Sequence, residues 1–321
     1  MSSKKYIITV DLGGTKILSA LLNEKNEIVQ RVKTPTNSNY GVKKIIEDIA
    51  ASINSLLEKA KLNEKEIKAI SIGVPGTVNP QTGVIAVAPN LGIKDFNIRK
   101  AIGKNFSVPV LIENDVNLAA LGIKYFELKD KLNNALVVFV GTGIGGALVF
   151  DGKLYRGSSF YAGEIGHMKI DKRGNISKNK NRSFEETASR TAIVRKINKA
   201  LEKGINSEIL SYVKEGGKIK SSALGKAVKR GDPLITEEVG RASKVIGRVL
   251  GSITTLLNVD TIILGGGVIE AMGDFMLPII SESFSEAVLP EPGKAVKIVA
   301  TKLGDDAPLY GGIALFNEFN S

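Results

Sequence analysis

Residues 7–16 read IITVDLGGTK, an apolar run that reaches Asp11 and then passes into Gly13 and Gly14. Glycine lacks a Cβ atom, so backbone N–H groups in such a turn can approach an anion closely. A carboxylate beside an anion site needs a cation, and Mg²⁺ bound to phosphate oxygens would supply it. The ordinary alternative is a tight hairpin turn without a ligand. The segment therefore predicts a strand, a glycine turn and a candidate nucleotide site.

A second segment follows the same plan. Residues 6–30 and 134–157 each contain an apolar strand, a glycine turn, a second apolar strand, a polar turn and a third short strand. When the two are superposed, Asp11 aligns with Gly141, and Gly13 aligns with Gly143. Such a repeat indicates two related α/β domains. Strand ends from both domains would then face one ligand in a cleft.

The composition is that of a globular protein with a basic surface. The 321 residues are enough for two domains, with 43% hydrophobic and 24% charged residues. There is no cysteine, which excludes disulfides, thiolate zinc sites and a cysteine nucleophile. The formal charge of +11 includes many scattered lysines, so we expect neither nucleic-acid binding nor, without a long apolar segment, a membrane span. We expect a cytoplasmic protein.

Helical periodicity follows each repeat. Apolar residues recur on one face of residues 42–57 and again over residues 239–257, where the face includes Leu256. Asp305 and Asp306 are typical of a helix N-terminus. Further short strands are expected at residues 69–74, 108–113 and 261–266.

Two more glycine turns follow apolar strands, at residues 141–146 and at residues 265–267. Neither is a P-loop, because the GxxxxGK[ST] spacing is absent. Neither is a dinucleotide-binding fingerprint, because a strand rather than a helix follows Gly146. Three such turns in one chain favour a nucleotide site over unrelated hairpins.

The segment VLIENDVNLAALG, residues 110–122, places Asn114 and Asp115 where a strand passes into a helix. Asp115 suits the N-cap of that helix, and this structural role would be sufficient to explain it. A carboxylate at the C-terminal edge of a strand can also accept a hydroxyl proton during phosphoryl transfer. The residues alone leave the two roles open.

The single histidine, His167, lies in YAGEIGHMKI, residues 161–170, three residues after Glu164. A lone histidine is usually structural. Together with the acid pair Glu185 and Glu186, however, these side chains can form a polar pocket. Sugar hydroxyls both donate and accept hydrogen bonds, so they need such a mixed set of groups.

Taken together, these motifs resemble the ROK family of sugar kinases, and its glucokinases most. The matching segments, in the family's order over about residues 6–315, are VDLGGTK, GVPGTVNP, APNLGIKDFN, IENDVNLAALG, VFVGTGIGGALVFDGKLYRG, AGEIGH, FEETASRTAI, IILGGGV and LGDDAPLYGG. The resemblance implies the two-domain, actin-like ATPase (ribonuclease H-like) α/β fold with an interdomain active-site cleft. We expect a small domain at 1–117, joined by a C-terminal helix at 306–321, and a large domain at 118–305.

The resemblance also implies a role for each site residue. Asp115 is the general base, and Asp11 holds Mg²⁺ through phosphates and water beside ATP. Of the acid pair, Glu185 and not Glu186 is the sugar ligand. The sugar-binding residues are Gly76, Asn90, Asn114, Asp115, Glu164, His167 and Glu185. The nucleotide-binding residues are Asp11, Gly13, Gly14, Thr15, Lys16, Gly141, Thr142, Gly143, Gly265, Gly266 and Gly267.

The chain departs from the family in two respects. Many members hold zinc with the histidine of GH and three cysteines, but Ile176, Lys178 and Ser183 stand at the cysteine positions. None of these is a thiolate, so we expect no zinc site, and something else must order the loop at 171–183. The family's repressors carry an N-terminal DNA-binding domain, and a first strand near Tyr6 leaves no room for one.

The function expected from the resemblance is ATP-dependent phosphorylation of glucose at the 6-hydroxyl, which gives glucose 6-phosphate for glycolysis. Two alternatives stay open. One is a kinase of N-acetylmannosamine, N-acetylglucosamine, mannose or fructose; the other is a non-catalytic sugar-binding regulator. The expected partners are a hexose, ATP and further copies of the chain, as a homodimer or homotetramer, while the range of phosphoryl donors is left open.

Overall fold

The computed structural model describes residues 4–171, 173–174, 182–213 and 217–320. The chain forms two compact units. The first comprises residues 1–131, 154–162 and 305–321, and the second comprises residues 132–153 and 163–304. The first unit thus includes residues 118–131 and 154–162, beyond the small domain expected from the sequence. The domain boundaries expected from the sequence stay a prediction.

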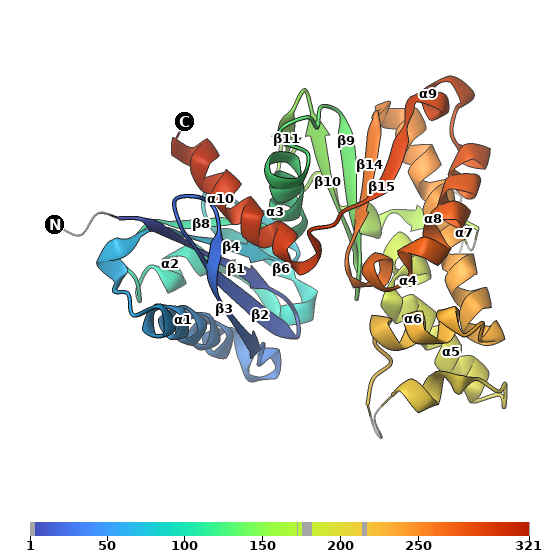
Figure 1. Ribbon diagram of the computed structural model, residues 1–321, viewed down its shortest axis with the longest axis horizontal. Coiled ribbons are helices and arrows are strands. Elements are labelled where there is room, and N and C mark those ends of the chain that lie inside the picture. Colours follow the sequence, from blue (N-terminus) through green and yellow to red (C-terminus); the bar gives the residue numbers. More distant parts are fainter. Residues whose placement is uncertain (1–3, 172, 175–181, 214–216, 321) are drawn as a thin grey trace. The chain divides into compact units, whose positions relative to one another are not determined.

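A mixed five-stranded sheet forms the centre of the first unit, in the order β3-β2-β1-β4-β8 (Figure 1). Its strands are β1 (Tyr6–Leu12), β2 (Lys16–Leu22), β3 (Ile28–Pro35), β4 (Ile67–Val74) and β8 (Val110–Asn114). Strand β1 pairs antiparallel with β2 and parallel with β4, so the first glycine turn closes a hairpin in the middle of the sheet. A smaller antiparallel sheet contains β5 (Thr77–Asn79), β6 (Val84–Ala88) and β7 (Ile93–Asn97).

The second five-stranded sheet repeats this plan in the order β11-β10-β9-β14-β15. Its strands are β9 (Ala135–Val140), β10 (Ile144–Phe150), β11 (Lys153–Tyr155), β14 (Thr261–Gly265) and β15 (Lys297–Ala300). Strand β9 pairs antiparallel with β10 and parallel with β14, as β1 does with β2 and β4. The repeat predicted from the sequence is therefore confirmed. A short ribbon pairs β12 (Lys169–Ile170) with β13 (Arg182–Ser183).

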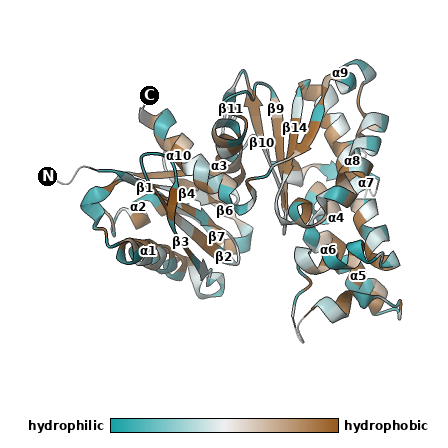
Figure 2. Cartoon of the chain, in the orientation of Figure 1, coloured by the Kyte–Doolittle hydropathy of each residue, from teal (hydrophilic) through white to brown (hydrophobic). Residues whose placement is uncertain are grey.

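Helices pack on these sheets through their apolar faces. The helices of the first unit are α1 (Gly41–Ala60), α2 (Ile98–Ile102), α3 (Asp115–Gly122) and α10 (Ala307–Asn320). Those of the second unit are α4 (Phe184–Ala188), α5 (Arg190–Leu201), α6 (Ser221–Lys229), α7 (Pro233–Leu257), α8 (Gly267–Ala287) and α9 (Pro290–Ala295). Figure 2 shows the central strands as largely hydrophobic and the outer side of α1 as hydrophilic.

The predicted apolar face of the first helix is confirmed. Ile45, Ile49, Ile53 and Leu56 of α1 are fully buried in the core of the first unit, in which the strands also take part. The second predicted face is wrong at its end, because Leu256 is 81% exposed in the last turn of α7. No helix in the described part of the chain has the length and apolarity needed to cross a bilayer. The cytoplasmic location stays a prediction.

Helices α3 and α10 approach each other so closely that only glycine fits at two contacts. A Cβ atom on Gly122 would lie 2.0 Å from the backbone oxygen of Ala307, and one on Gly311 would lie 1.8 Å from that of Leu118. The C-terminal helix is thereby packed against the helix that begins at Asp115. This contact holds the start of α3 at the edge of the first sheet.

Candidate functional site

Three neighbouring strands of the first unit end side by side. Asp11 of β1 pairs with Gly73 of β4, and Gly73 pairs with Glu113 of β8. The three strands are parallel, so their carboxyl ends lie at one edge of the sheet, where α/β proteins bind ligands. Asp115 follows two residues after Glu113 in the chain. The fold therefore gathers Asp11 and Asp115 at the same sheet edge.

Asp115 is the first residue of α3, but it is not the N-cap. Asn114 is the N-cap, because its Oδ1 accepts hydrogen bonds from the N–H groups of Val116 (2.9 Å) and Asn117 (3.0 Å). The N-cap interpretation of Asp115 is therefore wrong, although its Oδ1 also accepts from the Val116 N–H at 2.9 Å. A Cβ atom on Gly73 would lie 3.4 Å from the Asp115 Cα, so glycine at this position leaves room for the candidate base.

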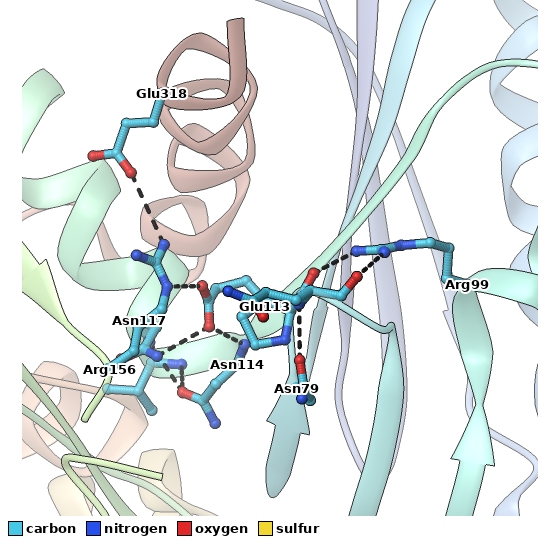
Figure 3. A network of polar contacts seen from close by, with 10 residues as sticks. Asn79, Arg99, Glu113, Asn114, Asn117, Arg156 and Glu318 are labelled. Carbon is cyan, nitrogen blue, oxygen red and sulfur yellow. Dashed lines mark hydrogen bonds and ion pairs between the residues drawn. The ribbon is translucent and has the colours of Figure 1, made fainter. Parts of the chain in front are cut away.

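A buried ion pair holds the strand end in front of this helix. Glu113 is 1% exposed, and its Oε2 accepts a hydrogen bond from Arg156 Nε at 2.6 Å. Its Oε1 accepts from Asn117 Nδ2 at 3.0 Å and from the Asn114 N–H at 2.9 Å. Figure 3 shows Arg156 between Glu113 and Glu318, whose Oε2 lies 3.9 Å from Arg156 Nη2. A buried carboxylate needs such partners, and here they fix the position from which the candidate base follows.

The first glycine turn follows Asp11, a carboxylate whose charged form is disfavoured by burial. The Gly13 N–H donates to the Lys16 carbonyl at 2.9 Å, and the Lys16 amino group pairs with the Asp305 carboxylate. Burial raises the pKa of Asp11 from 3.8 to about 6; Lys16 opposes this rise and Asp305 adds to it. Asp11 as a whole residue is partly exposed. A carboxylate whose charged form is disfavoured by burial is suited to a bound cation.

Three predicted sugar ligands lie near this turn. Gly76 has a φ of 86°, and a Cβ atom there would lie 2.3 Å from a neighbouring carbonyl oxygen. Asn114 Nδ2 donates to the Gly76 oxygen at 3.0 Å. A Cβ atom on Gly14 would lie 3.4 Å from the Asn90 Cβ. The first unit thus brings Gly76, Asn90 and Asn114 to the edge that carries Asp115.

The second unit brings two glycine segments together. The Gly141 N–H donates to the Gly143 oxygen at 2.8 Å, which closes the turn between β9 and β10. Gly266 is the N-cap of α8 with a φ of 85°, and a Cβ atom on it would lie 2.7 Å from the Val140 oxygen. Both glycine segments therefore lie at the ends of the neighbouring strands β9 and β14.

A buried hydroxyl lies beside these segments. Ser221, at the start of α6, is buried, and its Oγ has no hydrogen-bond partner among the residues that the structure describes. A Cβ atom on Gly267 would lie 3.6 Å from that oxygen. An unpaired buried hydroxyl costs free energy, so a ligand with a polar group would stabilise it.

A cluster of acidic and imidazole groups lies against the second turn. Glu185 Oε2 accepts a hydrogen bond from the Ile144 N–H at 2.9 Å, and a Cβ atom on Gly143 would lie 2.0 Å from the same oxygen. Glu164 Oε2 lies 3.6 Å from Nε2 of His167, whose side chain is 74% exposed. Burial raises the pKa of Glu164; His167 opposes this rise and Glu185 adds to it. The second unit therefore gathers Glu164, His167 and Glu185.

The segment before Glu185 is ordered at its end by a capping box. Ser183 Oγ accepts from the Glu186 N–H at 3.1 Å, and Glu186 Oε2 accepts from the Ser183 N–H at 2.7 Å. This contact fixes the helix that carries Glu185 and gives Glu186 a structural role. Ile176 and Lys178 lie outside the described residues. Within the described residues no three His, Asp or Glu side chains are grouped to hold a metal ion, and the absence of zinc stays a prediction.

Sequence reasoning missed three residues of this arrangement: Gly73, Arg156 and Arg190. Each lies within a quoted motif, Gly73 at the start of GVPGTVNP, Arg156 in LYRG and Arg190 in FEETASRTAI. A glycine at a strand end was a signal for Gly73. The two arginines had no local signal, because their partners, Glu113 and Thr142, lie 43 and 48 residues away in the chain.

Two related α/β units, each with a glycine turn between its first two strands, are the frame in which the comparisons with known proteins can be read. The model of the ROK family matches residues 7–318, so the chain belongs to the ROK family. Its fold is accordingly the mixed α/β, actin-like ATPase fold with two five-stranded sheets.

Relatives in this family include enzymes and regulators. A glucokinase from Halalkalibacterium halodurans is 30% identical, over 97% of this chain and 94% of that protein. A xylose repressor from Caldicellulosiruptor bescii is 27% identical, over 96% of this chain and 77% of that protein. The crystal structure of a ROK family glucokinase from Streptomyces griseus, in complex with glucose and AMPPNP, has a TM-score of 0.82 and 26% identity, covering 96% of this chain and 97% of that one. The chain is thus a ROK family sugar kinase or regulator.

Proposed function

We propose that this protein is an ATP-dependent hexose kinase, a glucokinase that transfers the γ-phosphoryl group of ATP to the 6-hydroxyl of glucose. The observation that carries the proposal is the placement of Asp115, which begins α3 directly after a strand end fixed by a buried ion pair. A carboxylate at the ligand-binding edge of the sheet is suited to accept a proton.

The proposed reaction is a balanced phosphoryl transfer. The Asp115 carboxylate accepts the proton of the 6-hydroxyl while the sugar oxygen forms a bond to the γ-phosphorus. The bond between that phosphorus and the bridging oxygen breaks, and its electron pair leaves on ADP. Asp115 then releases the proton to solvent. Exclusion of water from the bound sugar and nucleotide would suppress the transfer of the phosphoryl group to water.

The sugar is held by groups that match the hydroxyls of a hexose. Glu164, His167 and Glu185 accept or donate hydrogen bonds from the second unit, and their cluster beside one turn supports this role. We assign the remaining contacts to Gly76, Asn90 and Asn114 of the first unit. The raised pKa of Glu164 favours its use as a hydrogen-bonding group in a desolvated pocket.

ATP and Mg²⁺ are the proposed cofactors. The two glycine turns and residues 265–267 would hold the nucleotide, with Ser221 as a further polar contact, and the AMPPNP bound to the Streptomyces griseus relative supports this use of the fold. Asp11 fits a Mg²⁺ site for two reasons. Burial raises the pKa of its carboxyl, so a nearby cation would stabilise the ionised form, and Mg²⁺ prefers oxygen ligands. When bound, Mg²⁺ would neutralise charge on the phosphates.

The test of the base is the substitution Asp115→Asn. A positioned base contributes roughly 10²–10⁴ in rate, so we expect a loss of at least about 10²-fold in kcat. Glucose should still bind, which calorimetry measures, because the amide keeps the shape and part of the hydrogen bonding. Near-wild-type kcat for this variant would remove Asp115 from the mechanism.

The choice of sugar needs a direct assay. N-acetylmannosamine, N-acetylglucosamine, mannose and fructose carry hydroxyls that the same residues can bind, so each is an alternative substrate. A panel of these sugars in a coupled ADP-release assay ranks them by kcat/KM, and we expect glucose to rank first. The expected homodimer or homotetramer is measured by light scattering.

A sugar-binding regulator without turnover is the second candidate, because a xylose repressor is among the relatives. The presence of Asp11, Asp115, Glu164, His167 and Glu185 in one chain supports the kinase instead. Glucose binding by calorimetry, with no sugar phosphate formed from Mg²⁺-ATP, would favour the regulator.

A further inference from the structure

Arg190 joins helix α5 to the second glycine turn. It is the first residue of α5, and its backbone N–H donates to the Gly141 oxygen at 3.0 Å. Its Nη2 donates to the Thr142 Oγ1 at 2.6 Å. Thr191 adds a third contact, because its hydroxyl donates to the Thr142 oxygen at 2.7 Å. One of the three hydrogen bonds to this turn therefore comes from a positively charged group, the Arg190 guanidinium.

Within the part of the chain that the structure describes, this charge has no carboxylate partner. Among the described residues, no Asp or Glu forms an ion pair with Arg190, whereas Lys196 on the same helix lies 3.6 Å from Glu238. Partial burial lowers the pKa of the Arg190 guanidinium. A Cβ atom on Gly141 would meet nothing within 4 Å, so there is open space beside the turn.

We propose that Arg190 binds the phosphate chain of the nucleotide held by the second turn, an inference that rests on the proposed function. A guanidinium has five N–H donors in a planar fork and matches phosphate oxygens in pairs. One donor contacts Thr142, and the others can contact an anion. Because Thr142 Oγ1 accepts from Arg190, its own O–H is directed away and can donate to a phosphate oxygen. Arg190 thus supplies charge to the turn and orients its hydroxyl.

The inference predicts selectivity for phosphate rather than for the nucleoside. Calorimetry with adenosine, ADP and AMPPNP, in the absence of sugar, separates the two contributions. We expect Arg190→Gln to weaken AMPPNP and ADP by about ten- to hundredfold, the usual effect of a lost hydrogen bond to a charged group, and to leave adenosine unchanged. Arg190→Lys keeps the positive charge but loses the planar set of N–H donors. Its affinity for AMPPNP and ADP should lie between those of wild type and Arg190→Gln.

A neighbouring arginine provides the matched control. Arg195, on the same helix, donates to the backbone oxygen of Glu186 at 2.7 Å, an atom outside the turn. Arg195→Gln should therefore leave all three affinities unchanged. The backbone bond of residue 190 and the bond from Thr191 remain in every variant, so the turn keeps its anchor. The salt dependence of AMPPNP affinity should be shallower in Arg190→Gln than in Arg195→Gln.

The inference and the proposed function fail differently. If wild-type protein phosphorylates glucose while Arg190→Gln binds AMPPNP as tightly as wild type, the role of Arg190 is wrong and the kinase stands. An equal loss for adenosine also contradicts it, because the effect would not follow the phosphates. If no sugar is phosphorylated but AMPPNP affinity depends on Arg190, the phosphate contact stands and the kinase proposal fails.

Discussion

The first and second glycine turns occupy equivalent places in two sheets of the same strand order, yet they carry opposite charge. The first follows Asp11, whose carboxyl has a pKa raised by burial. In the second, Gly141 stands at the position of Asp11, and the nearby charge is the cation of Arg190. We propose that this difference suits one hairpin to a metal ion beside the phosphates at the first turn and to the phosphates alone at the second.

The charged side chains that contact the two turns also differ. At the first turn the only lysine, Lys16, is paired with Asp305, so its charge is already compensated within the unit. At the second turn the Thr142 hydroxyl accepts from an arginine that has no carboxylate partner among the described residues. These charges are consistent with the proposed metal ion at the first turn and the proposed phosphate at the second.

Among substitutions that compare the two turns, the largest expected effect comes from removing the acid of the first turn. Asp11→Asn should reduce kcat by about 10²–10³-fold, the usual cost of losing one group that stabilises charge in the transition state. The turn itself should stay intact, since the Gly13–Lys16 backbone bond does not involve the side chain. Steady-state kinetics over a range of Mg²⁺ concentrations measures the loss. A variant that keeps wild-type kcat would mean that the two turns do not differ in the proposed way.

The converse substitution places an acid in the second turn. Gly141→Asp fits sterically, because a Cβ atom there meets nothing within 4 Å, and Gly141 does not need a positive φ. A carboxylate next to phosphate costs several kcal/mol, so nucleotide affinity should fall by about 10²-fold. Gly141→Asn is the matched control without charge and should bind AMPPNP nearly as wild type. Equal binding by both variants would show that phosphate does not lie at this turn.

A smaller effect is expected from the ion pair between Arg156 and Glu113, which lies next to the candidate base. Among the described residues, no equivalent ion pair is found at the second turn. Arg156→Ala leaves Glu113 without its charged partner and should lower kcat by about tenfold through a small displacement of Asp115. The KM for glucose should change less than kcat. The control is Glu318→Gln, which removes the charge 3.9 Å from Arg156 Nη2, keeps an oxygen that can accept from the Tyr125 hydroxyl, and should be nearly silent. If both variants behave alike, the network does not position the base.

The smallest effect is on stability and depends on pH. Because burial raises the pKa of Asp11 to about 6, the folded protein binds this proton more tightly than the unfolded chain does, and stability falls as pH rises from about 4 through 6. Asp11→Asn removes this penalty. In the presence of EDTA and without nucleotide, its Tm should exceed that of wild type by a few degrees at pH 7.5, which corresponds to about 1–2 kcal/mol.

The advantage should shrink at pH 4.5, where Asp11 is protonated in the folded wild-type protein. Melting curves at the two pH values measure it. A Tm difference that does not change with pH would contradict the raised pKa of Asp11. A lower Tm for Asp11→Asn at pH 7.5 would show that the carboxylate stabilises the apo protein.

The strand plan could be predicted from the sequence, because alternation of apolar runs with glycine turns is a local signal. The equal strand orders of the two sheets confirm the repeat of residues 6–30 in residues 134–157. The face of α1 was equally readable, since Ile45, Ile49 and Ile53 follow the helical period. The exposure of Leu256 could not be predicted, because periodicity does not tell where a helix extends past the elements that cover it.

Parts of the candidate site needed the three-dimensional structure. The choice between Asn114 and Asp115 as N-cap depends on one backbone dihedral, and both residue types cap well. The pairs Arg156–Glu113 and Arg190–Thr142 join residues far apart in the chain, so no spacing rule finds them. The role of Gly73 follows from strand register, which decides that it stands between Asp11 and Glu113. Site roles carried by the family resemblance remain predictions.

We propose that the Asp115 carboxylate and two differently charged glycine turns act on one sugar and one nucleotide. The decisive experiment is a crystal structure of the wild-type protein with glucose, Mg²⁺ and AMPPNP. We predict the 6-hydroxyl within hydrogen-bonding distance of the Asp115 carboxylate, the metal beside Asp11 and the phosphates against Thr142 and Arg190. A glucose whose 6-hydroxyl lies away from Asp115, or nucleotide phosphates bound elsewhere, would contradict the account.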